Sequence, residues 1–133
     1  MKRILLAYDG AEPAKKALAL TADLAKTYDA AVTVVSVVPV HPGRTPIDPW
    51  DDTEVHRAEL REAAAALRDQ GIEPELIEPA GDPATMIERV AEQGRFDLIV
   101  VGTRGLSAVG RAMQGSVSEH VATHAETTVV IAR

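Results

Sequence analysis

Short apolar runs alternate with longer amphipathic segments along this chain of 133 residues. Continuous apolar runs are typical of strands buried on both faces of a sheet, whereas apolar residues spaced three and four apart indicate helices. By these criteria the sequence predicts five strands. They run from Ile4 to Ala7, from Ala31 to Val38, from Ile72 to Glu78, from Asp97 to Val101 and from Thr127 to Ala132.

Four helices are predicted between these strands, and residues that favour helix boundaries mark their ends. Asp82-Pro83 is typical of an N-cap followed by proline in the first helical position. The segment from Ser116 to Glu119 fits a capping box, and Gly71 is placed to end the second helix. The predicted helices begin near Pro13, Thr53, Pro83 and Ser116 and extend to about Tyr28, Gln70, the residue before Gly94, and Ala125.

The alternation of strands and helices predicts an α/β fold, because parallel strands are joined by right-handed helical crossovers. We expect an open five-stranded parallel sheet in the order 3-2-1-4-5, with helices on both faces, in one Rossmann-like domain covering residues 1–133. Pro74 and the charges around it suit an edge strand. The proline-rich stretch from Pro39 to Asp52 is interpreted as a loop within the domain, either a lid or plain surface.

A glycine pattern follows the fourth predicted strand: Gly102, Gly105, Gly115 and Ser116 are spaced G-x2-G-x9-G-S. Glycine lets backbone N–H groups approach an anion, and a Gly-Ser pair that opens a helix directs N–H donors and the positive end of the helix dipole to one point. In sheets of this class, ligands bind where the strand order reverses. The pattern therefore indicates a phosphate cradle, and the alternative is a tight turn with close helix packing.

Several polar side chains have two interpretations each. Asp9 follows the first strand, so it could face a ligand at the switch point or cap the turn into the first helix. Arg104 and Arg111 lie within the glycine loop and could pair with phosphate or remain solvated. His120 and His124 are four residues apart on one predicted helix and could share a metal ion. No third ligand is apparent in the sequence, so we expect them to flank a packed face and predict no metal site.

Composition narrows the classes of partner. The chain has 14 basic and 20 acidic residues, a net charge of -6, and only one Trp, two Tyr and one Phe. The acidic balance leaves no excess of basic residues to neutralise phosphates, and the few aromatic residues offer little surface for base stacking. No nucleic-acid partner is therefore expected. The absence of cysteine excludes disulfides and thiolate metal ligands and agrees with a reducing cytoplasm. No apolar run approaches the length of a membrane span, so a soluble cytoplasmic protein is expected.

Five segments of the chain carry a resemblance to a known family. They are the opening Ile4 to Gly10, the turn Gly81-Asp82-Pro83, the run Asp97 to Ser107, the motif Gly115 to Glu119 and the apolar Val129 to Ile131. This combination, spread over nearly the whole chain, resembles the universal stress protein family. The resemblance implies a five-stranded parallel sheet in a homodimer. The ATP-binding branch of that family has the same G-x2-G-x9-G-(S/T) pattern, so the chain resembles the members of the family that bind ATP.

The resemblance also implies a role for each motif position. Ala7, Asp9 and the backbone of Val37 would hold the adenosine end of ATP, and Val101 and Gly102 would lie close to the ribose. The residues implied around the phosphates are Gly105, Gly115, Ser116, Val117 and Ser118.

The leading hypothesis for function is a homodimeric stress-response regulator that binds ATP, with Mg2+ or Mn2+ held through the phosphates, and changes its partner contacts accordingly. A slow ATPase or nucleotidyl-transferring enzyme ranks second, because the glycine loop has no Gly-Lys-Ser/Thr P-loop and no assured general base beside Ser116. A nucleotide-free interaction protein is the third hypothesis. A dimer is expected through the last strand, Thr127 to Ala132, whose apolar edge a two-fold mate could cover.

Overall fold

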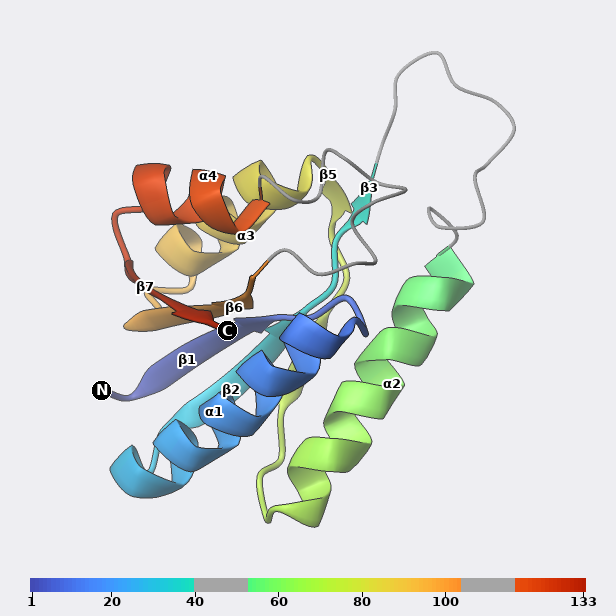
Figure 1. Cartoon of the computed structure of the whole chain (residues 1–133), viewed down its shortest axis with the longest axis vertical. Helices are drawn as coiled ribbons and strands as arrows, with labels where there is room; N and C mark the ends of the chain where they lie inside the picture. The colour runs from blue at the N-terminus through green and yellow to red at the C-terminus, as the bar shows by residue number, and fades with distance from the viewer. Residues whose placement is uncertain (40–52, 104–116) are drawn as a thin grey trace.

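A five-stranded parallel sheet forms the centre of the molecule (Figure 1). The computed structural model describes residues 1–39, 53–103 and 117–133. The sheet strands are β1 (Arg3–Ala7), β2 (Ala31–Val35), β4 (Glu75–Ile77), β6 (Leu98–Gly102) and β7 (Thr128–Ala132). Their order is β4-β2-β1-β6-β7, and every pairing is parallel. Counted along the chain within this sheet, that is the predicted order 3-2-1-4-5, with β4 and β7 at the edges.

The predicted strand from Ala31 to Val38 is wrong as a single strand. It divides into β2 and a short β3 (Val38–Pro39), which pairs with β5 (Ala80–Gly81) in a separate two-stranded sheet. The division lies opposite Pro79, which has no amide hydrogen to donate to the ladder. Its carbonyl still accepts from the Val38 N–H at 2.8 Å, so the two segments stay side by side while regular pairing is interrupted.

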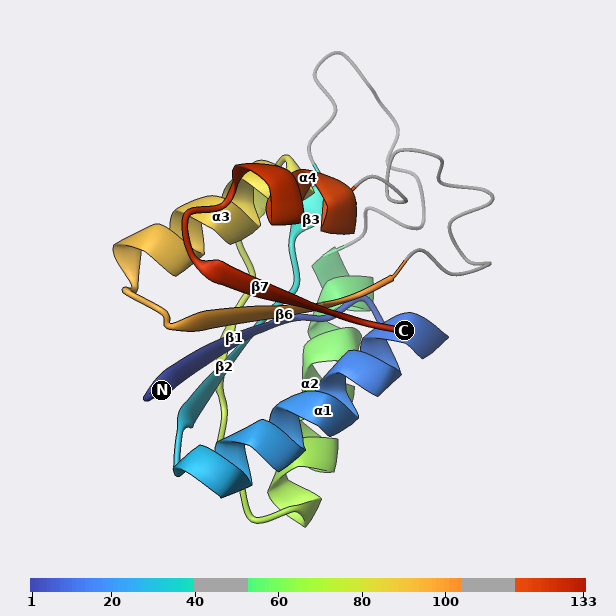
Figure 2. The ribbon, with the colours of Figure 1, turned by 60° about the vertical axis from the view of Figure 1, so that its left-hand side comes forward.

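Two pairs of helices cover the two faces of the sheet. The helices are α1 (Glu12–Tyr28), α2 (Thr53–Asp69), α3 (Pro83–Gln93) and α4 (Val117–His124). Figure 2 shows α1 and α2 against one face and α3 and α4 against the other. Successive side chains of β1 explain this arrangement, because Ile4 and Leu6 pack with α1 and α2 while Leu5 packs with α3 and α4. The central strands are buried on both faces, as their continuous apolar runs predict.

Local interactions set the boundaries of α3 and α2 as the sequence predicts. Asp82 is the N-cap of α3, and its Oδ2 accepts from the Thr85 N–H at 3.0 Å and from the Thr85 hydroxyl at 2.8 Å. These bonds to the ionised form hold the pKa of Asp82 below its ordinary value. Gly71 follows α2 with a φ of +81°, a conformation that favours glycine. The capping box predicted at Ser116 lies outside the described residues.

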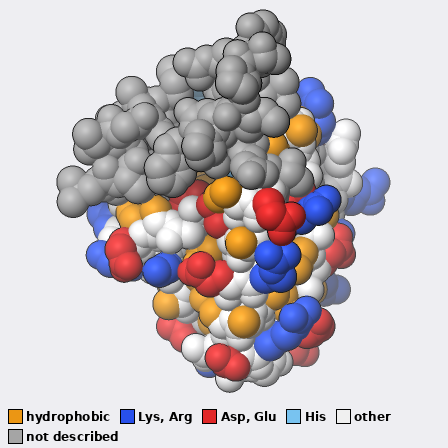
Figure 3. Space-filling view, turned by 90° about the vertical axis from the view of Figure 1, so that its right-hand side faces the viewer, with side chains coloured by type: hydrophobic (Ala, Val, Ile, Leu, Met, Phe, Trp, Pro, Cys, Tyr) orange, Lys and Arg blue, Asp and Glu red, His pale blue; other side chains and the backbone are white. Residues whose placement is uncertain are grey.

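The outer face of α2 is charged and solvated. Arg57 and Arg61 lie near Glu54, with N–O distances of 3.7 and 3.5 Å, and the Arg68 guanidinium donates to both oxygens of Glu73. Figure 3 views the side of the molecule that carries α2, where basic and acidic side chains are interspersed. None of the helices in the described ranges is long and apolar enough to cross a membrane.

Candidate functional site

A pocket lies beyond the carboxyl ends of the central strands, where the chain leaves β1 toward one side of the sheet and β6 toward the other. This is the switch point at which ligands bind in open α/β sheets. Seven of the residues predicted for a nucleotide site line this one pocket: Ala7, Asp9, Val37, Val101, Gly102, Val117 and Ser118. Four others, Arg104, Gly105, Gly115 and Ser116, lie outside the described residues, as does Arg111.

The inner wall of the pocket is apolar. Val35, Val37 and Val101 are each at most 9% exposed, and Ile87 of α3 joins them from the face of the sheet opposite α1. Planar aromatic ligands are held mainly by such walls, with a few polar groups that fix their orientation. The wall is thus suited to a nucleobase or a similar flat apolar group.

The N-terminal end of α4 forms another part of the pocket wall. Val117 is the first residue of this helix and Ser118 the second, and both line the pocket. The first N–H groups of a helix have no partner within it, and the helix dipole places partial positive charge there. Ser118 is only 8% exposed. The arrangement suits an anion next to the apolar wall.

Gly102 has a packing role that the structure makes explicit. A Cβ built on Gly102 would lie 2.4 Å from the carbonyl carbon of Pro13 and 2.5 Å from its oxygen. These are backbone atoms of the first turn of α1, so they cannot move aside as a flexible side chain would. Close helix packing, the alternative to a phosphate role in the sequence analysis, therefore accounts for glycine at this position.

Asp9 also has a local structural role. Its Oδ1 accepts from the Ala11 N–H at 3.0 Å, which caps the turn into α1. The residue is exposed and lines the pocket as well. Of its two interpretations, turn capping is therefore present in the structure, and its position leaves it near any ligand in the pocket.

A buried polar cluster that sequence reasoning missed lies beside the pocket. The Ser36 hydroxyl is 2.9 Å from His56 Nδ1 and donates to Glu59 Oε2 at 3.1 Å, while His56 Nδ1 lies 3.2 Å from the same oxygen. Ser36 and His56 are 2% and 4% exposed, and both line the pocket. The only sequence signal was the spacing of three residues between His56 and Glu59 on one helix face.

This cluster differs from the triad of serine hydrolases. In that triad the serine and the acid occupy opposite nitrogens of the imidazole, so that a proton can pass from one side to the other. Here Ser36 and Glu59 both face Nδ1 of His56. The cluster fixes the polar side of α2 against the end of β2 and supplies a polar border to the pocket.

Comparison with known proteins identifies the family. The model of the universal stress protein family matches residues 1–133. The chain belongs to the universal stress protein family. A universal stress protein of Thermus aquaticus is 38% identical to it over 136 residues, which cover 99% of this chain and 98% of that protein.

Solved structures share the fold of this universal stress protein. A universal stress protein from Archaeoglobus fulgidus in complex with dAMP superposes with a TM-score of 0.76 at 23% identity, covering 100% of this chain and 98% of that one. A family member from Arabidopsis thaliana with AMP bound gives a TM-score of 0.74 at 20% identity, covering 99% of this chain and 91% of that one.

Proposed function

We propose that this universal stress protein binds ATP in the switch-point pocket and acts as a nucleotide-dependent regulatory switch. One observation carries the proposal: an apolar wall and a helix N-terminus meet in the pocket formed by the predicted site residues. A nucleotide combines a flat base with an anionic tail, so it needs both features at a short distance from each other. The dAMP and AMP complexes of related folds support adenine as the base.

The proposed orientation follows from the positions of these two features. The adenosine end lies against Ala7, Asp9 and Val37, and the ribose lies near Val101 and Gly102. The phosphates extend toward Val117 and Ser118 at the start of α4. In this proposal the motif residues Arg104, Gly105, Gly115 and Ser116 complete the phosphate cradle, and Mg2+ or Mn2+ is held through the phosphates.

Amide mapping tests where the nucleotide binds. In a ¹⁵N-labelled sample titrated with ATP, we expect the largest shift changes at the backbone amides of Asp9, Val37, Gly102 and Ser118. The amides of the pocket at the other end of α3, such as those of Glu92 and Thr127, serve as internal controls. Changes centred on the controls, with the four pocket amides unmoved, would contradict the proposed site.

We further propose that the protein forms a homodimer through the segment from Thr127 to Ala132. β7 is an edge strand, and its Val129 and Val130 are only partly covered while Ile131 is 37% exposed. An apolar edge strand is a template for pairing, and a two-fold mate would cover it. Sedimentation at micromolar concentration is expected to give twice the monomer mass; monomer alone would contradict the dimer.

A further inference from the structure

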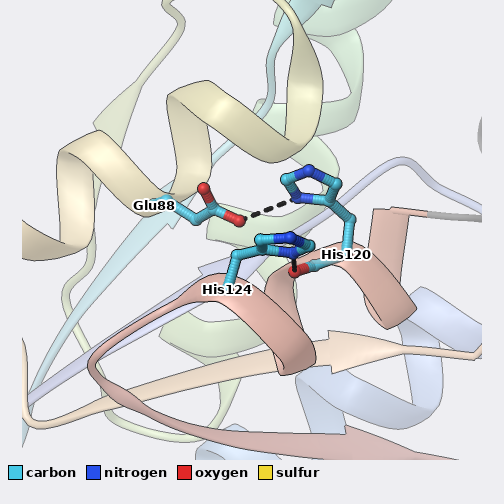
Figure 4. A group of neighbouring side chains, drawn as sticks. All are labelled: Glu88, His120 and His124. Atoms are coloured by element: carbon cyan, nitrogen blue, oxygen red, sulfur yellow. Dashed lines mark hydrogen bonds and ion pairs between the residues drawn. The ribbon is translucent and has the colours of Figure 1, made fainter.

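We propose that Glu88, His120 and His124 form a binding site for a divalent transition metal ion, with Zn2+ as the best match. The site lies between α3 and α4, outside the switch-point pocket. Figure 4 shows the Glu88 carboxylate directed from α3 toward the His120 ring, with the His124 ring stacked beside it. The sequence offered two histidines without a third ligand, and the fold supplies the third ligand from another helix.

The geometry brings three ligand atoms together. One nitrogen from each imidazole and one Glu88 oxygen all lie within 4.8 Å of one another. Zinc bonds of about 2.0–2.2 Å place tetrahedral ligands roughly 3.5 Å apart, so the most widely separated pair of ligand atoms must approach by at most about 1.3 Å. The His120 and Glu88 side chains are 44% and 22% exposed, which leaves them room for this adjustment by rotation about side-chain bonds.

Hydrogen bonding prepares His124 for coordination. Its Nδ1 lies 3.0 Å from the His120 carbonyl oxygen, and a carbonyl can only accept, so Nδ1 carries the proton. The Nε2 atom of a neutral His124 then has the lone pair that binds a metal. Metal-ligating histidines are usually oriented in this way by a hydrogen bond from the second ring nitrogen.

The two imidazole rings lie side by side on one face of α4. The ring centroids of His120 and His124 are 4.1 Å apart with an interplanar angle of 19°. Residues i and i+4 lie on one helix face, which is why both rings reach the same side of α4.

The surrounding charges attract a cation. The adjoining cavity is lined by Glu88 and His124 together with Glu92 and Glu126, while Arg95 is the cationic residue of its described lining. The described lining thus has three carboxylates and one guanidinium. Donors of two imidazoles and a carboxylate, in a chain without cysteine, match Zn2+, Co2+ or Ni2+ better than Mg2+ or Ca2+, which prefer all-oxygen sites.

The competing explanation is a simple ion pair between α3 and α4. His120 Nδ1 is 2.9 Å from Glu88 Oε1, and this contact alone would link the two helices without a metal. His124 distinguishes the two explanations, because it takes no part in the ion pair but contributes a ligand to the metal site. A variant of His124 is therefore the decisive one.

Zinc titration of the chelator-treated full chain tests the site. We expect one Zn2+ per chain, a rise in melting temperature on Zn2+ addition and none on Mg2+ addition. His124→Ala and Glu88→Gln should each weaken Zn2+ binding by roughly tenfold to a hundredfold. Glu12→Gln, on the exposed side of α1, is the matched control for Glu88→Gln and should bind Zn2+ as the unmodified chain does.

Two outcomes would overturn the metal site. The first is the absence of saturable Zn2+ binding in the unmodified chain, which would leave the ion pair as the only role of the cluster. The second is equal Zn2+ binding by the unmodified chain and His124→Ala. Circular dichroism of each variant separates loss of a ligand from loss of folding, and binding of Co2+ adds a visible absorption band that reports directly on the ligand set.

Discussion

Replacing Gly102 by alanine is expected to destabilise the protein by roughly 3 kcal/mol, as overpacking against a rigid neighbour does. The added Cβ would lie 2.4 Å from the Pro13 carbonyl carbon, so α1 must move away from the end of β6. That movement opens the packing of α1 over β1 and β6, whose side chains form the larger core cluster. Urea denaturation measures the effect as a lower midpoint at an unchanged slope.

Gly71→Ala is the matched control for this experiment. A Cβ at Gly71 meets nothing within 4 Å, and its φ of +81° is the source of strain on substitution. The expected cost is about 1 kcal/mol, typical of a non-glycine residue in the left-handed region. A Gly102→Ala variant as stable as Gly71→Ala would contradict the packing role and return Gly102 to a role in ligand binding alone.

Ser118→Asp is expected to weaken ATP binding by about tenfold to a hundredfold while the affinity for adenosine changes little. A carboxylate about 5 Å from a phosphate is repelled by roughly 3 kcal/mol at an effective dielectric constant of about 20, and counterions reduce this value. The favourable interaction of an acidic residue in the first turn of α4 with the helix dipole offsets part of the cost of placing a charge at this buried position. Calorimetry with ATP and adenosine measures both affinities.

Ser118→Asn separates charge from size in the same position. Asparagine has the shape of aspartate without its charge, so any loss common to both variants reflects the filling of the pocket beside Val117. We expect the asparagine variant to bind ATP more tightly than the aspartate variant by at least about tenfold. Equal ATP affinities for the two variants would contradict a phosphate position at the start of α4.

Most strands and helices of the fold were predictable from sequence because each carried its own local signal. The apolar runs that form β1 and β6 required burial on both faces, and Pro74 marked β4 as an edge strand. The Asp82-Pro83 pair indicated the start of α3, because it is typical of an N-cap followed by proline in the first helical position. Such signals depend only on residues that are close in the sequence, so they can be recognised without knowledge of tertiary contacts.

Interactions between distant residues were not predictable in the same way. Asp97 Oδ2 accepts from the backbone N–H groups of Lys2 and Arg3 at 2.8 and 2.9 Å, and these bonds lower the pKa of Asp97. Tyr8 donates to Glu62 at 2.7 Å, and its burial, together with this carboxylate, raises the pKa of Tyr8 well above its usual range. Nothing in the sequence near either residue indicates its partner.

The candidate site was partly predictable for the same reason. The resemblance located Ala7, Val37 and Val101, which the fold brings to one pocket. The glycine spacing alone left two interpretations of Gly102, and the distance to Pro13 was needed to show that packing demands glycine there. The polar border of Ser36 and His56 required the placement of α2 over the end of β2, which no periodicity specifies.

Calorimetric titration of the purified protein with ATP and Mg2+ tests the central proposal most directly. The account predicts saturable binding of one nucleotide per chain with a dissociation constant below about 1 mM. No heat of binding at millimolar ATP would contradict the account.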